Sequence, residues 1–321
     1  MIKDSNILIT GGHGFIGAHL AKHLGEDSLN NRIVILDLHT TGRTTGIDLD
    51  INSLKSVTTV NGSLLNEADL NKLPNDFDYI IHAAGFLGID KVAEMQLETM
   101  KLNIDGTHNC LNLAARQKKK PFVLIFSTSE IYGIHSDKAI ESDDAIIPTQ
   151  GKRWCYAASK LAAEYYLKAY IQEYSIKGAI VRPFNVFGPY RHGSNAMTKI
   201  ISLAIENKPI SISGDGKQVR AWCYIDDFCQ GITSILKNST GTGDAYNLGD
   251  PRNQISMLDL AKLITSLLGS NSKIIISNST IEDVLFRVPD ISKAVNLLGY
   301  KPKVVFNNAI MNVAKLLKKE S

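Results

Sequence analysis

The sequence predicts an α/β protein in which a doubly wound parallel sheet carries a smaller C-terminal lobe. Three observations predict this fold. Continuous apolar runs alternate with helix-period segments through the first half of the 321 residues, as in sheets whose strands are buried on both faces. A glycine-rich turn follows the first run. Beyond residue 184 the runs become short and are separated by Gly, Pro, Asn and Asp.

Five apolar runs are the expected strands of the sheet, because they do not alternate with polar residues. The runs are Asn6–Thr10, Arg32–Leu36, Tyr79–His82, Phe122–Phe126 and Gly178–Arg182. The helix-period segments between them include Ile16–Leu24, Thr99–Arg116 and Ala157–Tyr174. Since strands and helices alternate, we expect right-handed βαβ units.

The smaller lobe is expected mainly in residues 185–321. Its short strands are Ile210–Ile212 and Lys273–Ile276, and its short helices are Met197–Glu206 and Met257–Leu268. One strand near residues 245–249 is expected to return to the sheet, which otherwise belongs to residues 1–184.

Composition narrows the class of protein. With 44% apolar and 21% charged residues, the chain can bury a core without disulfides. A net charge of +3 gives no basic field, so no nucleic-acid partner is expected. The polar start and the lack of a long apolar run predict a cytoplasmic protein without a membrane partner. The four cysteines form no CxxC pair and no metal-binding spacing, so we expect free thiols and no metal.

The turn Thr10–Gly17 joins the first strand to the first helix and has glycines at 11, 14 and 17. Gly11 permits the tight turn, Gly14 lets the backbone approach a pyrophosphate, and Gly17 lets helix and strand pack closely. Free N–H groups at the start of the helix attract phosphates. A plain loop is the alternative, but the flanking strand and helix favour a dinucleotide site of the Rossmann type.

Asp37 ends the second strand, 20 residues beyond Gly17. Its carboxylate can accept both ribose hydroxyls of NAD and would repel the 2′-phosphate of NADP. A helix or turn cap is the other interpretation of Asp37. Arg43 is near enough to leave NADP as an alternative, but the pattern favours NAD.

Small residues follow the strand that ends at His82. At Ala83, Ala84 and Gly85 the short side chains let a cofactor lie against the backbone. Asn103, on the next helix, would hold this region by hydrogen bonds, and an ordinary surface asparagine is the alternative.

Tyr156 and Lys160 stand four residues apart in a helical pattern, so they share one helix face. This helix follows the strand that leads to Thr128, at the edge where such sheets bind ligands. A phenol with a pKa of about 10 is a poor base at neutral pH, but an adjacent ammonium and a cationic nicotinamide both favour the phenolate. We expect Tyr156 to take the proton of a substrate hydroxyl that Thr128 holds, while Lys160 holds the cofactor ribose. A surface Tyr and Lys are the alternative.

These residues together resemble the extended short-chain dehydrogenase/reductase family, in its NAD-dependent epimerase/dehydratase group acting on nucleotide-sugars. The resemblance runs nearly end to end. At Ser63 it departs from the family, which often has an Asp that touches adenine. Its strongest segments are Thr10–Gly17, His82–Gly85, Ser127–Gly133, Tyr156–Lys160, Arg182–Pro189, Gly214–Arg220, Tyr224–Asp227, Pro289–Lys293 and Leu297–Gly299.

The resemblance implies roles for particular residues. Thr128, Tyr156 and Lys160 would be the catalytic trio. Asn185 and Arg220 would contact the substrate diphosphate, which suits a planar guanidinium. The NAD site would comprise Gly11, Gly14, Phe15, Ile16, Gly17, Asp37, Ala83, Ala84, Gly85, Asn103, Tyr156, Lys160 and Pro183.

The triplet Thr128-Ser129-Glu130 bears on the second chemical step. It is similar to that of UDP-glucuronate decarboxylases, some UDP-glucuronate 4-epimerases and GDP-mannose 4,6-dehydratases, whereas dTDP-glucose dehydratases more often have Asp-Glu. A 4-keto sugar has an acidic C5 hydrogen, and with a C6 carboxylate it is a β-keto acid. One intermediate can therefore lead to epimerisation, loss of water or loss of carbon dioxide. Ser129 would belong to the substrate site, and Glu130 would move a proton or be purely structural.

The leading hypothesis is a UDP-sugar 4-epimerase that works through a transient 4-keto intermediate. UDP-glucuronate decarboxylation and NDP-sugar 4,6-dehydration are its rivals; an NADPH-dependent ketone reductase and a non-catalytic dinucleotide sensor are more remote. Arg191, ahead of His192, would face a substrate carboxylate, with a surface loop charge as the alternative. In the relatives, the helices corresponding to residues 92–116 and 157–174 pair between subunits, so a homodimer is expected.

Overall fold

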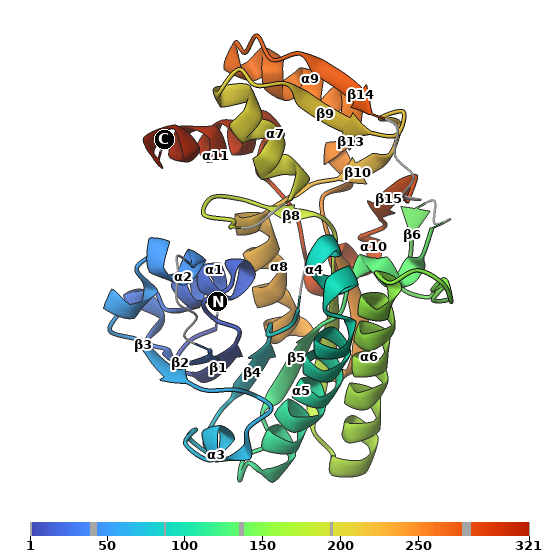
Figure 1. The fold of residues 1–321 in the computed structure, drawn as a ribbon. Coiled ribbons are helices and arrows are strands. Elements are labelled where there is room, and N and C mark those ends of the chain that lie inside the picture. Colours follow the sequence, from blue (N-terminus) through green and yellow to red (C-terminus); the bar gives the residue numbers. More distant parts are fainter. Residues whose placement is uncertain are drawn as a thin grey trace.

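A computed structural model describes residues 2–38, 44–86, 88–134, 138–192, 195–277 and 284–320. Its central sheet has seven parallel strands in the order β12-β7-β5-β4-β1-β2-β3 (Figure 1). These strands are β1 (Asn6–Thr10), β2 (Arg32–Asp37), β3 (Val57–Asn61), β4 (Tyr79–His82), β5 (Phe122–Phe126), β7 (Lys177–Pro183) and β12 (Thr242–Leu248). The predicted doubly wound α/β fold is confirmed.

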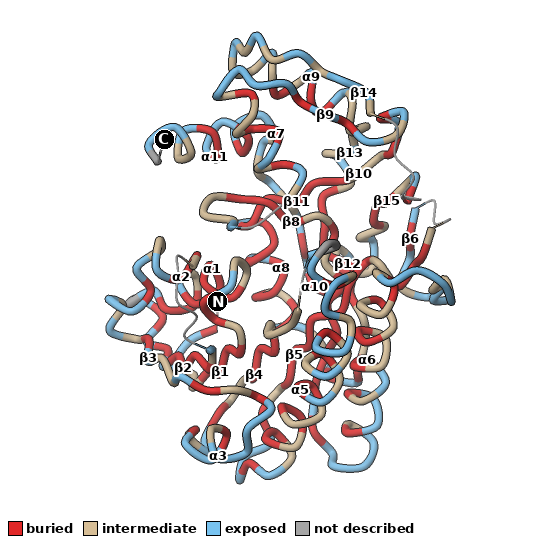
Figure 2. Tube along the Cα trace, in the orientation of Figure 1, coloured by how far each residue is buried: buried red, intermediate tan, exposed pale blue. Residues whose placement is uncertain are grey.

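Alternation along each strand sends side chains to two helical layers. Ile7 and Ile9 of β1 are fully buried in one core cluster, with α1 (Phe15–Leu24) and α8 (Ile225–Asn238). Leu8, between them, is fully buried in a second cluster, with α5 (Gln96–Arg116) and α6 (Trp154–Tyr174). The continuous apolar runs of the sequence therefore reflect helices on both faces of the sheet. Figure 2 shows buried residues following the central strands.

The smaller lobe is built on two short sheets. One has the order β13-β10-β15-β6 and the other pairs β14 with β9. Its strands are β6 (Lys138–Ala139), β9 (Ile210–Ser213), β10 (Val219–Ala221), β13 (Gln254–Ser256), β14 (Ile274–Ser277) and β15 (Phe286–Pro289). Its helices are α7 (Ala196–Ile205), α9 (Met257–Leu268) and α11 (Phe306–Glu320). The helix α10 (Ser292–Leu298) packs against α8 and β12 of the larger part.

Shorter elements connect these layers. A further pair joins β8 to β11 in parallel. The remaining elements are α2 (Thr45–Asp48), α3 (Glu67–Leu70), α4 (Ile89–Glu94), β8 (Val186–Phe187), β11 (Cys223–Tyr224) and the 3-10 helices η1 (Asp27–Leu29), η2 (Ile51–Ser53), η3 (Ser129–Tyr132) and η4 (Pro251–Asn253). Within the described ranges, the helices lack the length and apolar composition that spanning a membrane would require.

Two strands pair with partners from the other side of residue 184, the boundary that the sequence predicts between the two parts of the chain. β12 pairs with β7 at one edge of the central sheet, whereas β6, from the first half of the chain, pairs with β15 of the lobe. The division into domains at residue 184 stays a prediction. Arg43, which kept NADP open as a cofactor, lies outside the described residues.

The parallel sheet brings four loops to one edge. The segments that follow β1, β4, β5 and β7 all leave the carboxyl ends of neighbouring strands, which is where open α/β sheets bind their ligands. The predicted cofactor and catalytic residues lie in these loops and in the helices that follow.

Candidate active site

The glycine-rich turn is sterically closed to side chains. Gly11 has φ +71°, and a Cβ there would lie 2.7 Å from the Ala84 Cα. A Cβ on Gly17 would lie 2.2 Å from the Gly11 carbonyl oxygen. Gly14 is the N-cap of α1, whose first turn carries Phe15 and Ile16 against the core. This close turn at a helix N-terminus is the geometry that a pyrophosphate needs, so the residues fit a dinucleotide.

Asp37 is fastened to this turn. It ends β2, and its Oδ2 accepts a hydrogen bond of 2.8 Å from the His13 backbone N–H. One carboxylate oxygen thus caps the turn, as the alternative interpretation of Asp37 required. The predicted contact of Asp37 with a ribose stays a prediction.

A buried chain of hydrogen bonds runs from the turn to the helix of the reactive residues. His82 lies between the hydroxyls of Thr10, 2.8 Å from Nδ1, and Thr107, 3.0 Å from Nε2. Burial, with the charge of Lys160 adding to it, lowers the pKa of His82 to about 3, so this ring is neutral. Thr107 donates to the backbone oxygen of Asn103, whose amide in turn donates to Ser159 Oγ at 3.0 Å. Asn103 is fully buried, so the surface alternative for it is wrong.

The predicted reactive residues come together. The Tyr156 phenol is hydrogen-bonded to the Thr128 hydroxyl. Lys160 is 3% exposed, and burial lowers the pKa of its ammonium to about 8. A Cβ on Gly85 would lie 3.0 Å from Lys160 Nζ, so the small residues after β4 make room for this side chain.

The chain by itself does not acidify the phenol. Burial raises the pKa of Tyr156 and the Glu130 carboxylate raises it further, while the Thr128 hydrogen bond and the Arg191 charge oppose the rise. In the chain alone the loss of solvation outweighs the nearby positive charge, and the predicted phenolate of Tyr156 stays a prediction. The cationic nicotinamide is the other contribution that the prediction invoked.

Glu130 lies between two guanidinium groups. It lies in η3, two residues beyond Thr128, whose hydroxyl caps its backbone N–H at 3.2 Å. Its Oε1 is 3.3 Å from an Arg153 nitrogen and 3.6 Å from an Arg287 nitrogen. The three side chains are only 18%, 12% and 9% exposed. Arg153 also covers the ring of Trp154, its centre 5.0 Å from the ring centroid.

Arg287 is the functional candidate that sequence reasoning missed. It lies on β15, and the segment Pro289–Lys293 that resembles the family begins only two residues later. This neighbourhood was the one available signal. The pairing of β15 with β10 and β6, which brings Arg287 to Glu130, is not visible in a local pattern.

The turn after β7 holds the other predicted substrate residues. Pro183 ends β7, and Asn185 adopts a positive φ of 36° while its amide donates to the Ala221 carbonyl at 3.1 Å. Arg191 lies over the Phe15 ring, 4.9 Å from its centroid, and donates to the Val186 carbonyl. Burial lowers the pKa of Arg191 to about 10, with Tyr156 opposing, which still leaves a cation at neutral pH.

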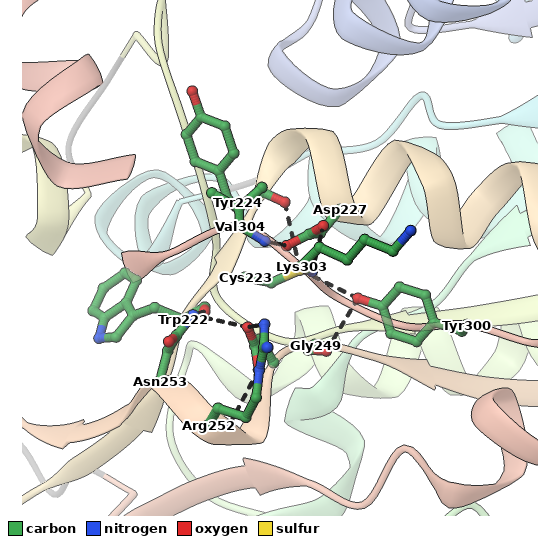
Figure 3. A network of polar contacts seen from close by, with 11 residues as sticks. Trp222, Cys223, Tyr224, Asp227, Gly249, Arg252, Asn253, Tyr300, Lys303 and Val304 are labelled. Atoms are coloured by element: carbon green, nitrogen blue, oxygen red, sulfur yellow. Dashed lines mark hydrogen bonds and ion pairs between the residues drawn. The ribbon is translucent and has the colours of Figure 1, made fainter. Parts of the chain in front are cut away.

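Two further segments have distinct positions. Ser129 is buried in η3, and Arg220 lies on β10 directly opposite Arg287 of β15. The segment Tyr224–Asp227 caps and begins α8, and its Asp227 accepts the backbone N–H groups of Lys303 and Val304, both at 2.9 Å. Figure 3 shows this second polar network. Its closest link to the predicted site is the bond from the Cys223 N–H to the Asn185 carbonyl, at 3.2 Å.

Known proteins are similar in sequence to this chain along nearly all of its length. The model of the NAD dependent epimerase/dehydratase family matches residues 7–249. UDP-glucuronic acid decarboxylase 1 of Xenopus tropicalis is 31% identical over 324 residues, covering 99% of this chain and 73% of that protein. UDP-N-acetyl-alpha-D-glucosaminuronate decarboxylase of Bacillus cytotoxicus is 29% identical over 313 residues, with 94% of each chain covered.

A solved structure is also similar to this chain in both fold and sequence. UDP-glucuronic acid 4-epimerase from Bacillus cereus, in complex with UDP-glucuronic acid and NAD, is 28% identical, with a TM-score of 0.88 over 98% of this chain and 100% of that one. Among the described residues no cluster of three or more His, Cys, Asp or Glu side chains is placed to hold a metal. The chain is an enzyme whose cofactor is NAD, and it belongs to the NAD-dependent epimerase/dehydratase family of nucleotide-sugar enzymes.

Proposed function

We propose that the enzyme oxidises C4 of a UDP-hexuronate and releases the C6 carboxylate as carbon dioxide. The observation that carries this proposal is the pairing of Glu130 with both Arg153 and Arg287, at 3.3 and 3.6 Å. A planar guanidinium binds a carboxylate through two parallel hydrogen bonds, so a C6 carboxylate would bind beside Arg153 and Arg287 more strongly than a neutral C6 hydroxyl.

The diphosphate is held from the same lobe. Arg220 pairs across from Arg287 on the neighbouring strand, so both side chains leave one face of the sheet. Arg220 and Asn185 would bind the diphosphate, and Arg287 the carboxylate further along the same ligand. Ser129 lies in η3, between Thr128 and Glu130, where it would contact the sugar.

The first step removes the C4 hydrogen and the hydroxyl proton. Thr128 holds the C4 oxygen, and Tyr156, hydrogen-bonded to Thr128, accepts the hydroxyl proton. Gly11, Gly14 and Asp37 would hold the dinucleotide, with Lys160 at its ribose. When bound, NAD supplies the acceptor of the first hydride and the donor of the last.

The second step uses the β-keto acid that the first step creates. The C5–C6 bond breaks, carbon dioxide leaves, and the electron pair passes through C5 to the C4 oxygen, where Thr128 and Tyr156 stabilise the enolate. C5 then takes a proton from water, which the Glu130 carboxylate, ion-paired to Arg153 and Arg287, would orient. Hydride return to C4 and proton return from Tyr156 complete the cycle.

Epimerisation at C4 is the second candidate, because the Bacillus cereus UDP-glucuronic acid 4-epimerase superposes with a TM-score of 0.88. On the sequence pattern alone, C4 epimerisation is the leading hypothesis. We place decarboxylation ahead because two relatives named as UDP-uronate decarboxylases cover 99% and 94% of the chain. The chemistry also differs, since epimerisation requires the 4-keto sugar to turn over, and a carboxylate clamped by Arg287 resists that rotation.

The test is to incubate the purified enzyme with UDP-glucuronate, UDP-N-acetylglucosaminuronate, UDP-glucose and UDP-N-acetylglucosamine and to weigh the products. Loss of carbon dioxide from either uronate supports the proposal. An unchanged mass with inverted C4 would replace it by epimerisation, and loss of water by dehydration. Turnover of the neutral sugars alone would overturn the assignment of Arg287 to a carboxylate.

A further inference from the structure

A buried ion pair joins α6 to β7 beneath the candidate active site. Arg182 donates from Nε to one carboxylate oxygen of Glu164 at 2.9 Å and from a terminal nitrogen to the other at 2.8 Å. The two side chains are 7% and 1% exposed. Although burial lowers it, the hydrogen bonds and charge of Glu164 keep the pKa of Arg182 above its usual value.

One end of this pair reaches the catalytic segment. The Ser127 hydroxyl donates to Glu164, and Ser127 immediately precedes Thr128. Glu164 lies two helical turns beyond Tyr156 on α6. The same carboxylate therefore contacts the strand end that carries Thr128 and the helix that carries Tyr156.

The other end reaches the lobe. Arg182 donates to the Tyr132 phenol at 2.7 Å, and that phenol donates to Asn247 Oδ1 at 2.8 Å. Burial raises the pKa of Tyr132 to about 12, so its hydroxyl remains a donor at neutral pH. The Asn247 amide then donates to the backbone oxygens of Ala139, at 3.1 Å, and Asp290, at 3.3 Å.

The contacts of Asn247 with Ala139 and Asp290 connect it to the strands β6 and β15. Ala139 ends β6 and Asp290 directly follows β15, the strand of Arg287. Tyr132 is itself the last residue of η3, which Glu130 shares. The polar chain thus touches both halves of the site, the oxidising half at Thr128 and Tyr156 and the carboxylate half at Glu130 and Arg287.

We propose that this chain sets the spacing between the two halves of the site. Its members are positioning residues, since they act through the groups they hold. Resting on the proposed function, the inference adds that the 4-keto sugar must meet both halves without moving. A displacement of about 1 Å at such a site can cost about a hundredfold in rate. The positioning residues are Glu164, Arg182, Tyr132 and Asn247.

The test uses variants that leave the ion pair intact. Tyr132→Phe removes one hydroxyl and disconnects Arg182 from Asn247. We expect kcat on the UDP-hexuronate to fall between about tenfold and a hundredfold, KM to change by less than about twofold, and more of the 4-keto product to escape. Asn247→Ala is expected to do the same, and the double variant to be no worse than Asn247→Ala, because the two residues form one connection.

The matched control is Tyr300→Phe. This phenol is 1% exposed and donates to the Gly249 carbonyl at 3.1 Å, in the second polar network (Figure 3). It is expected to lower the melting temperature about as much as Tyr132→Phe and to leave kcat within about twofold. If Tyr132→Phe lowered the melting temperature alone, the positioning role would be overturned while the proposed function stood. A native enzyme inactive on every UDP-hexuronate would overturn the proposed function, and this inference with it.

Discussion

Arg220 and Arg287 lie directly opposite each other on the parallel strands β10 and β15. Residues paired in this way project from the same face of a sheet, so both side chains leave one face of this short sheet. A nucleotide-sugar acid carries its negative charge at two places, the diphosphate and the carboxylate. The proposed function assigns Arg220 to the diphosphate and Arg287 to the carboxylate, which is the basis of the first prediction.

Replacing Arg287 should separate acidic from neutral ligands. We expect Arg287→Gln to weaken UDP-glucuronate binding at least about thirtyfold, since a buried charge partner is removed, and to change UDP-glucose binding by less than about twofold. Arg287→Lys should be intermediate, because it keeps the charge and loses the planar fork. Calorimetric titration of both ligands measures the ratio. The control is the exposed Arg116→Gln, and equal losses for both ligands would count against a carboxylate contact.

Lys160 should lower the stability of the folded protein at neutral pH and yet be required for activity. Its pKa is lowered from 10.5 to about 8 by burial, so below pH 8 the folded chain carries a buried ammonium at a cost of about 3 kcal/mol. Between pH 8 and 10.5 the unfolded chain binds more protons than the folded one, and the cost is relieved as pH rises. Without NAD, Lys160→Met should therefore melt higher than the native chain at pH 7, and the gap should close toward pH 10.5. An unchanged gap would exclude this origin, and turnover by Lys160→Met would exclude the catalytic role.

Two glycines should respond to alanine in opposite directions. A Cβ on Gly17 would lie 2.2 Å from the Gly11 carbonyl, so Gly17→Ala should disrupt the turn and abolish NAD binding. Gly106, inside α5, has its nearest neighbour at 3.6 Å from such a Cβ. Gly106→Ala should stabilise the protein by about 0.5–1 kcal/mol, because glycine is unfavourable inside a helix. Thermal melts with and without NAD compare the two, and a Gly17→Ala protein that binds NAD normally would contradict the steric argument.

Asp37 should affect NAD more than its position as a turn cap requires. Asp37→Asn keeps an oxygen for the His13 N–H, the 2.8 Å bond of the turn, but loses the charge. We expect the NAD affinity to fall about tenfold or more, because hydrogen bonds to charged groups contribute about 1.5–3 kcal/mol. Fluorescence titration measures it, with the exposed Asp259→Asn as control. Native affinity in Asp37→Asn would leave only the capping role.

The helices α5 and α6 are the predicted dimer surface. Leu97 on α5 is 75% exposed and Tyr165 on α6 is 65% exposed, so each helix presents a large side chain that a second subunit would cover. We expect light scattering to give the mass of a dimer, and Tyr165→Asp to give that of a monomer. A native chain of monomeric mass would refute the prediction.

The site residues that could be predicted are those that belong to a short local sequence pattern. Gly11, Gly17 and Asp37 follow from one turn between one strand and one helix, and Tyr156 and Lys160 from the spacing of a single helix. Arg287 acquires its meaning only when β15 pairs with β10 and β6, and these partners lie far apart in the chain. The burial that raises the pKa of Tyr156 in the chain alone is hidden for a similar reason, because it depends on the packing of the whole site.

The secondary structure shows the same difference between features set by local sequence and features set by distant segments. The strands β1, β2, β4, β5 and β7 were predicted within one or two residues, since each is a continuous apolar run. The helices α1, α5 and α6 begin one to three residues earlier than the predicted segments. In α5 the first turn is polar at Gln96 and Glu98, which interrupts the apolar periodicity. β3 has one buried residue, Val57, followed by half-buried and exposed ones, and it was missed because an edge strand lacks a fully apolar run.

The place of β12 at the edge of the central sheet has a consequence for synthesis. When residues 177–183 leave the ribosome, β7 can pair with β5 on one side, but its other side stays open until residues 242–248 are made. The nascent chain therefore carries a bare apolar edge through the translation of some sixty codons, and such edges recruit foreign strands. Production of this enzyme should accordingly benefit from slower translation or from added chaperone, and a ribosome stalled before codon 242 should expose a chain prone to aggregation.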